Sequence, residues 1–257
     1  MTTVLLLPHL LRASQNNWLS AGTGAGYIHI QDAAVSPLLY GGFQWASELA
    51  FLRESKNKRM HARYSYLNGE ITTSRTPIMQ SAIKRSGMEA LLGLEYRINR
   101  LSDESRSLFA GASLKAAYFN NNHHQFRNSE RQNYLISQVA LQLTHLQDIR
   151  FMGHAFRFES EVSIPILAFT VRNTFSYPLP ERWLRNQGQE LSDYIRSGQT
   201  FSWPGYAGIG VYTSLTRVLK NGHAIGLGYQ WQYSSLMEMN PLKMASHQLI
   251  LKTMFNF

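Results

Sequence analysis

Apolar and polar residues alternate one by one over long stretches of this chain, and this period of two constrains the fold most. Between Leu39 and Phe51 the odd-numbered positions carry most of the large apolar side chains, whereas Gln44 and Glu48 occupy even-numbered ones. Successive side chains of a β-strand point to opposite faces of the sheet, so the pattern predicts a strand with one apolar face. The alternation recurs, more weakly in the first segment, and predicts ten strands at residues 18–30, 39–51, 60–66, 89–99, 108–118, 135–144, 156–164, 206–218, 225–233 and 245–257.

The length of these segments favours a membrane barrel over a soluble β-sandwich, which remains the main alternative fold. Strands of soluble proteins usually have about 5–6 residues, whereas a strand that crosses a bilayer needs about 9–11. The mean hydropathy is only −0.25, as expected when each strand keeps one polar face. The longest apolar run, Val4 to Leu11, falls far short of the ~20 residues of a spanning helix. We therefore exclude helical membrane spans.

The connections between the predicted strands alternate strictly between short and long. The short ones are residues 54–58, 101–106, 146–150 and 219–222. The long ones are residues 31–37, 68–87, 121–132, 170–205 and 236–244. Bacterial outer-membrane barrels have short periplasmic turns and long extracellular loops. The sequence therefore predicts an all-β fold, a single transmembrane antiparallel up-and-down β-barrel of about ten strands.

The last residues of the chain carry a further pattern. From Leu249 to Phe257 apolar residues alternate with Lys252 and Asn256, and the chain ends on an aromatic residue. This segment resembles the closing strand of Gram-negative outer-membrane β-barrel proteins, and the architecture of the whole chain resembles theirs without indicating a subfamily. The resemblance implies an outer-membrane location. It also implies that Phe255 and Phe257 belong to the signal that the barrel-assembly machinery reads.

Residues 1–16 differ in character from the barrel segments. Val4–Leu7 and Leu10–Leu11, followed by Ala13 and Ser14, resemble the remnant of a secretory signal. A positively charged start is missing and Pro8 interrupts the apolar run, so a short segment of the mature chain is the competing interpretation. No stretch elsewhere resembles a linker. We therefore divide the chain into an N-terminal segment, residues 1–16, and one barrel domain, residues 17–257.

If the apolar faces contact lipid, the opposite faces line the lumen. A ten-stranded barrel is only slightly wider than the eight-stranded kind that side chains can fill. Opposite charges in so narrow a space are expected to pair, because isolated buried charges are costly. Together with several glutamines, the predicted lumen network consists of Glu48, His61, Arg63, Glu89, Glu95, Arg97, Lys115, Arg157, Glu159 and Glu161. We expect this network to close the lumen; a small-solute path or a ligand site is the alternative.

Residue patterns for catalysis on such barrels are missing from the sequence. Outer-membrane lipid hydrolases commonly place the catalytic histidine and serine as His-x-Ser, whereas His247 directly follows Ser246 here. Outer-membrane proteases of the ten-stranded kind use Asp and His pairs near the outer rim. Neither Asp32 nor Asp193 has a histidine two residues away. We therefore expect no enzymatic activity.

Other classes of site are disfavoured by composition and context. Cysteine is absent, which removes disulfides, thiolate metal sites and cysteine nucleophiles. His123 and His124 are adjacent but lack convergent third and fourth ligands. The glycine-rich residues 22–26 fall on a predicted strand with no following helix. A dinucleotide-binding site requires that helix, so the motif does not indicate one. The net charge of +9 is scattered along the chain, which argues against nucleic acid. We expect no cofactor and no metal.

The connection 170–205 contains the one helical pattern of the sequence. Pro180 and Gly198 are typical of helix ends. The rough apolar side of this helix would consist of Trp183, Leu184, Leu191 and Ile195. We interpret it as a lid on its own barrel, with docking on a partner as the alternative. Its basic side chains, suited to anionic lipopolysaccharide, are Arg182, Arg185 and Arg196.

A filled lumen without a catalytic set favours a structural or accessory subunit of an outer-membrane complex. A narrow channel for small solutes is the main alternative, and an envelope lipid hydrolase is a weaker one. The expected partners are outer-membrane lipids, lipopolysaccharide and the barrel-assembly machinery. Another outer-membrane protein is a further candidate.

Overall fold

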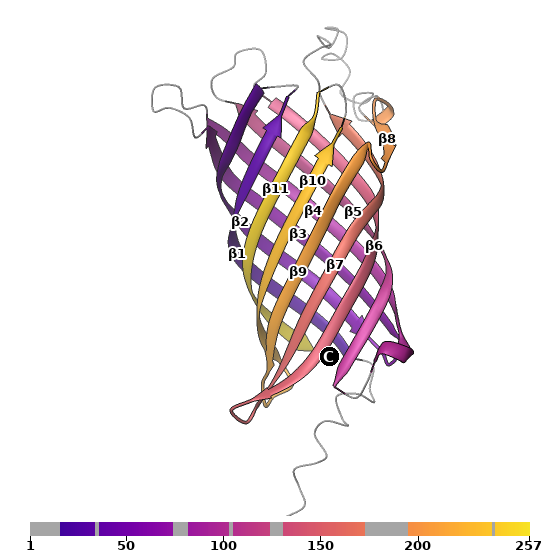
Figure 1. Ribbon diagram of the computed structural model, residues 1–257. Helices are drawn as coiled ribbons and strands as arrows, with labels where there is room; N and C mark the ends of the chain where they lie inside the picture. Colours follow the sequence, from indigo (N-terminus) through magenta and orange to yellow (C-terminus); the bar gives the residue numbers. More distant parts are fainter. Residues whose placement is uncertain are drawn as a thin grey trace, which may run out of the picture.

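Ten long antiparallel strands and one short strand form a closed barrel in the residues that the computed structural model describes (Figure 1). These residues are 16–33, 36–73, 82–102, 105–123, 131–172, 195–237 and 240–257. The long strands are β1 (Asn16–Asp32), β2 (Ser36–Glu54), β3 (Lys58–Thr73), β4 (Ala82–Arg97), β5 (Arg106–His123), β6 (Arg131–Phe151), β7 (His154–Arg172), β9 (Tyr206–Val218), β10 (Ala224–Leu236) and β11 (Leu242–Asn256). The short one is β8 (Gln199–Ser202).

Successive strands pair with one another, and the barrel closes between the first and the last. β1 pairs with β11 in continuous register from Trp18–Asn256 to Asp32–Leu242, and with β2 on its other edge. β7 differs from the other strands, because one of its edges pairs with β6 and the other with both β9 and β8. The up-and-down order confirms the predicted fold class.

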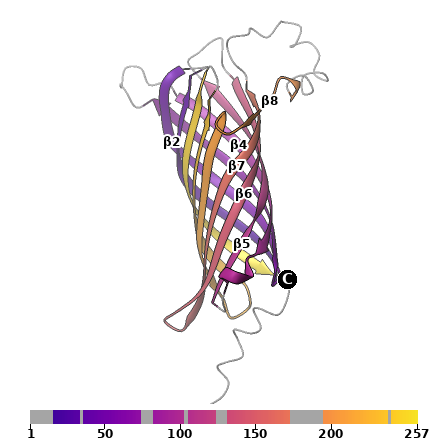
Figure 2. The ribbon, with the colours of Figure 1, turned by 45° about the vertical axis from the view of Figure 1, so that its right-hand side comes forward.

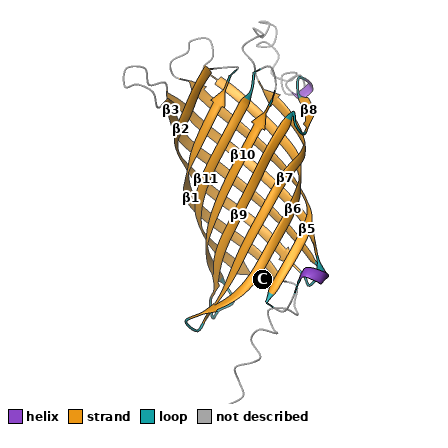
Figure 3. Cartoon of the chain, viewed as in Figure 1, coloured by secondary structure: helices purple, strands orange, loops and turns teal. Residues whose placement is uncertain are grey.

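The two ends of the barrel differ in their connections (Figures 2 and 3). Short turns at residues 55–57, 98–105, 152–153 and 219–223 lie at the end that also holds the last residue of the chain. One of them contains the 3-10 helix η2 (Asn99–Leu101). Another is a two-residue hairpin whose Met152 and Gly153 both have positive φ, 50° and 74°, the geometry that matches the twist of paired strands. We call this end the turn end and the opposite one the loop end.

The strands extend further toward the loop end than the sequence predicted. β6 has 21 residues, and the predicted loop 31–37 is reduced to the three residues between β1 and β2. Beyond the apolar belt the outward positions become polar, as at Asn68, Glu70 and Lys84, which are exposed. The alternation of hydrophobicity therefore fades although the backbone pairing continues.

The outer wall carries a belt of exposed apolar side chains. Phe43 and Trp45 of β2 are 72% and 71% exposed, and Leu92, Leu141 and Leu251 are similarly exposed on other strands. A contiguous apolar surface of this kind requires lipid, because water would not solvate it favourably. No helix in the described ranges is long and apolar enough to span a bilayer.

The inner wall carries many apolar side chains in its loop-end half, which the sequence did not predict. Fifteen buried apolar residues form one cluster there. The most deeply buried members include Ile30, Tyr40, Ile71, Ile83, Leu236 and Leu242. This apolar layer narrows the lumen near the loop end, and most of the buried charged side chains lie toward the turn end, Asp32, Arg85 and Arg172 excepted.

Candidate functional site

The turn-end half of the lumen is crossed by ion pairs centred on Arg59, which is 3% exposed. Its Nη1 lies 3.5 Å from Glu95 Oε2, and its Nη2 contacts Glu159 Oε1. Thr144 donates to Glu95 Oε1 at 2.5 Å, and Ser214 donates to Glu159 Oε2 at 3.3 Å. These residues come from β3, β4, β6, β7 and β9, so the contacts join distant parts of the wall. We call Arg59, Glu95, Thr144, Glu159 and Ser214 the turn-end network.

A second group of charges lies next to this network. Arg63 Nε lies 3.7 Å from Glu48 Oε2, and its guanidinium group stacks on the ring of Tyr212 at 4.3 Å. Lys252 donates to the Tyr212 hydroxyl at 2.6 Å. A cation above an aromatic ring is stabilised further when water is excluded. Strands from opposite sides of the closure are therefore connected through one tyrosine.

Three more of the predicted network residues, His61, Glu161 and Arg97, lie at different distances from the turn end of the lumen. His61 Nδ1 lies 4.0 Å from Glu95 Oε2 in the turn-end network. Gln142 donates to Glu161 Oε1 at 2.8 Å. Arg97 is half-buried one inward position beyond Glu95 toward the turn end.

Arg157 lies at the turn end itself, where the lumen meets solvent. Its Nη1 lies 3.2 Å from Glu54, and its Nε lies 3.1 Å from Asp148. The predicted residues therefore do not form one cluster. They extend from Arg157 at the turn end to Glu89 and Lys115, which lie higher in the lumen.

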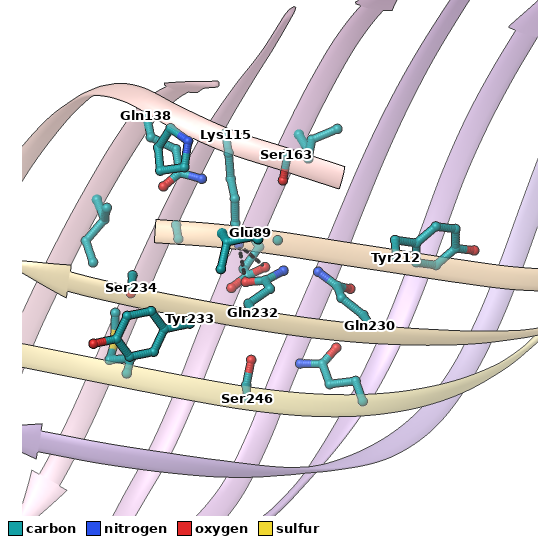
Figure 4. A pocket seen from close by; sticks show the side chains of 18 of the residues that line it. Glu89, Lys115, Gln138, Ser163, Tyr212, Gln230, Gln232, Tyr233, Ser234 and Ser246 are labelled. Atoms are coloured by element: carbon teal, nitrogen blue, oxygen red, sulfur yellow. Dashed lines mark hydrogen bonds and ion pairs between the residues drawn. The ribbon is translucent and has the colours of Figure 1, made fainter. Parts of the chain in front are cut away.

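Glu89 and Lys115 line a chamber of about 90 Å³ between the charged groups and the apolar layer (Figure 4). Their ion pair is 2.8 Å long, and Lys115 also donates to Gln232 at 2.7 Å. Uncharged polar side chains form much of the rest of this lumen chamber: Gln44, Gln138, Gln230, Gln248, Ser163 and Ser246. Its loop-side wall is apolar and includes Ile28, Leu67, Phe119, Ile136 and Met244. The chamber is therefore amphipathic.

A separate polar group closes the lumen at the loop end. Asp32 accepts a hydrogen bond from the Tyr134 hydroxyl at 2.5 Å and forms an ion pair with Arg172 at 2.8 Å. Arg85 donates to Asn121 at 3.1 Å and stacks on a neighbouring aromatic ring. Asp32, considered above as a catalytic candidate, is thus engaged in structural contacts.

The other catalytic candidates do not come together in the described part of the chain. Ser246 lines the lumen chamber, whereas His247 lies on the outer face with its Nδ1 2.6 Å from the Tyr229 hydroxyl. Asp193 and His124 lie outside the described residues, as does the side chain of His123. Among the described residues, no three His, Cys, Asp or Glu side chains gather as metal ligands would.

Most of the predicted lid helix also lies outside the described residues, which resume at Ile195. Residues 195–197 form a short helical turn, in which Ile195 is exposed. The lid interpretation therefore stays a prediction.

The terminal aromatic residues lie where β11 closes against β1. Phe255 and Phe257 are both exposed on the outer face. The Phe257 N–H donates to the carbonyl oxygen of Asn17 at 3.2 Å, and its ring centroid lies 6.4 Å from that of Phe51. These contacts hold the chain end at the seam between the first and last strands.

Comparison with known proteins finds similarity in structure alone. No family model and no curated protein sequence matches this chain. The outer-membrane protease OmpT of Escherichia coli has a TM-score of 0.55 and 8% identity, covering 95% of this chain and 98% of that one. The translocator domain of the autotransporter NalP from Neisseria meningitidis has a TM-score of 0.42 and 7% identity, with coverages of 96% and 90%. Neisserial surface protein A has a TM-score of 0.34 and 10% identity, with coverages of 93% and 97%. With its closed wall and apolar outer belt, the chain has the antiparallel β-barrel fold of the outer-membrane protease to which it is similar.

Proposed function

We propose that this barrel is a non-conducting, non-enzymatic protein that acts as a structural or accessory subunit in the outer membrane. The turn-end network is the observation that carries the proposal. Arg59 reaches from β3 to carboxylates on β4 and β7, so the network occupies the width of the lumen. Opening a path for ions there would leave buried charges without partners, which costs several kcal/mol for each ion.

The apolar layer provides a second barrier near the loop end. Ile71 is fully buried, and Ile30, Ile83 and Leu242 are almost fully buried. A hydrated ion cannot shed its water into an apolar layer without a large free-energy cost. Two barriers of different chemistry support a closed axis, and the surfaces left for function are the loops and the lipid-facing wall.

Conductance in planar bilayers tests the closed lumen. We expect the purified full-length barrel to give no steps above background under conditions in which an open porin conducts. A variant with Arg59, Glu95 and Glu159 replaced by alanine keeps the apolar layer and should also stay closed, whereas the same variant with Ile71→Ala and Ile83→Ala added should conduct, because both barriers are then weakened. Steady conductance by the wild-type barrel would favour the alternative, a narrow channel for small solutes.

Co-purification tests the accessory role. Native outer membranes are solubilised in a mild detergent after chemical crosslinking, and the barrel is isolated through an affinity tag. We expect a second outer-membrane protein in stable ratio to the barrel. Recovery of the monomer alone, with and without crosslinking, would refute the accessory role.

The absence of catalysis is tested separately, because the E. coli barrel of similar fold is a protease. In this chain Asp32 is already bonded to Tyr134 and Arg172, which supports a structural role for it. We expect no cleavage of a peptide library, and unchanged lipid A and phospholipid mass profiles when the gene is deleted. Cleavage or a changed lipid profile would contradict the proposal.

A further inference from the structure

The wall of the barrel is interrupted between β7 and β9. Pairing of these strands ends at Ser163–Gly210, and pairing of β7 resumes with β8 at Leu167–Ser202. Within the described residues, no strand pairing joins β7 residues 164–166 to residues 203–209. We call this interruption the β7–β9 seam.

Pro165 explains why the pairing stops there. Proline has no backbone N–H to donate, and β7 also carries a bulge at this point, because Pro165 lies opposite Ala140 and Leu167 opposite Val139. The Pro165 side chain is buried and faces Gly208 across the seam. A Cβ atom added at Gly208 would lie 3.1 Å from Pro165 Cγ. At this point the seam is therefore closed by packing of a proline ring against a glycine.

The lumen chamber lies directly behind the β7–β9 seam. Four residues that border the β7–β9 seam also line the chamber: Ser163, Pro165, Ile209 and Gly210. On the outside the same stretch of wall is apolar, with Ile164, Ile166 and Leu167 exposed and Trp203 74% exposed. A small separation of the seam would connect the chamber with the hydrocarbon region of the bilayer.

The lining of the chamber suits one class of ligand. It is polar toward the turn end and largely apolar toward the loop end. Of its charged members, Lys115 pairs with Glu89 and Arg63 with Glu48, whereas the Nε of Arg85 has no hydrogen-bond partner among the described residues. Gln44, 2% exposed, also lines it, and neither of its amide atoms has a hydrogen-bond partner among the described residues. Lys115 directs two of its three N–H donors to Glu89 and Gln232. An anionic head group would supply acceptors to Arg85, to the Gln44 amide and to the third N–H of Lys115.

We propose that the lumen chamber binds the head group of a single-chain anionic amphiphile, such as a long-chain fatty acid, whose hydrocarbon chain leaves through the β7–β9 seam into the bilayer. A chamber of about 90 Å³ holds about six to nine waters, enough for a carboxylate and its first methylene groups. This inference goes beyond the non-conducting role and is compatible with it, because a barrel closed along its axis is entered from the side.

Binding of palmitate to the delipidated full-length barrel in a non-ionic detergent tests the site. We expect saturable binding near one palmitate per barrel, and at least about tenfold weaker binding of palmitic acid methyl ester and of hexadecyltrimethylammonium, which lack the anionic head. Equal binding of all three amphiphiles, or no saturable palmitate binding, would overturn the proposal. Either result is independent of the conductance measurement.

Paired substitutions locate the head group. The double variant Glu89→Gln and Lys115→Gln keeps the chamber volume and leaves no unpaired partner of the ion pair, and it should weaken palmitate binding about tenfold. The matched control is Glu54→Gln with Arg157→Gln, an ion pair at the turn end, which should bind palmitate as the wild type does. Unchanged binding by the chamber variant would overturn the assignment, as would equal weakening in the control.

A crosslink tests the seam. The chain has no cysteine, so the two thiols introduced by Pro165→Cys with Gly208→Cys can form an intramolecular disulfide only with each other. Oxidation should slow palmitate exchange at least about tenfold and reduction should restore it, whereas Phe158→Cys with Leu215→Cys, in the intact ladder and away from the chamber, should leave exchange unchanged. Exchange that is equally fast in the oxidised seam variant would refute entry by this route.

A fluorescence measurement keeps the seam testable if the cysteine pair prevents folding. Palmitate brominated in mid-chain should quench Trp203, which is exposed beside the seam. Replacement Trp203→Phe should remove most of the saturable quenching, whereas Trp45→Phe on β2, across the barrel, should not. Quenching that survives Trp203→Phe unchanged would place the chain elsewhere and overturn the proposal.

Discussion

Removal of Arg59 alone should destabilise the barrel strongly, because it leaves two buried carboxylates without their cation. Glu95 is fully buried and Glu159 is 9% exposed, and within the described part of the chain each then keeps a hydroxyl donor, from Thr144 and from Ser214 respectively. Removing one partner of a buried ion pair costs about 3–5 kcal/mol. We therefore expect Arg59→Met to lower the free energy of unfolding by about this amount.

Neutralising the whole group should largely reverse the loss. The triple variant Arg59→Met, Glu95→Gln and Glu159→Gln removes the uncompensated charges, and replacement of a complete buried ion-pair group is often neutral or stabilising. We expect the triple variant to recover most of the free energy that the single variant loses. This recovery distinguishes an electrostatic penalty from a simple packing defect.

Urea unfolding of the barrel in detergent, followed by tryptophan fluorescence and by heat-modifiable migration on gels, gives both free energies. Arg217→Met is the matched control, because Arg217 is exposed and its hydrogen bond to His154 lies at the surface, and surface substitutions usually change stability by less than about 0.5 kcal/mol. A loss below about 1 kcal/mol for Arg59→Met, or a triple variant less stable than the single one, would refute the reasoning.

Three further predictions concern the loop-end closure, the apolar layer and the chain end. Tyr134→Phe removes a hydrogen bond to the buried Asp32 carboxylate and should cost about 1.5–3 kcal/mol in urea unfolding; an unchanged midpoint would contradict this. Ile71→Ala, in the fully buried apolar layer, should cost about 2–5 kcal/mol, clearly more than Leu49→Ala on the lipid-facing wall in the same assay. Phe257→Ala should lower the fraction of heat-modifiable barrel in cell outer membranes, through slower assembly, without changing the stability of purified barrel; equal assembly would refute its role in the signal.

The fold was predictable because alternation at the lipid-facing positions is a local property of each strand. The short strand β8 was not, since its pairing with β7 is a long-range contact and its four residues carry no period of their own. The predicted ends of the strands were wrong for a related reason. Beyond the apolar belt, outward residues such as Asn68 and Glu70 are as polar as loop residues. Hydrophobicity therefore locates the bilayer better than it locates the ends of pairing.

The lumen was predictable in its chemistry and not in its contacts. Arg59, the centre of the turn-end network, was missed because the predicted strand began at Met60, although it has the same parity as His61 and Arg63. Extending the alternation by one residue would have found it. The odd or even number of a residue within its strand shows whether its side chain points into the lumen. Which side chain it meets there depends on how far strands distant in sequence are shifted along one another, as for Arg59 and Glu159.

The turn-end network and the apolar layer close the barrel along its axis, whereas the β7–β9 seam is an interruption in its side wall. A molecule could reach the lumen chamber through any of these three places, at different free-energy costs. Passage through the turn-end network separates ions that have no other partner, and passage through the apolar layer strips water from any polar solute. Opening the β7–β9 seam separates no ion pair, because where its pairing lapses a proline ring faces a glycine, and a fatty acid that crosses it protonated carries no charge into hydrocarbon. Exchange with the bilayer is therefore the route that we propose, and a ligand that takes it must be compatible with hydrocarbon for most of its length.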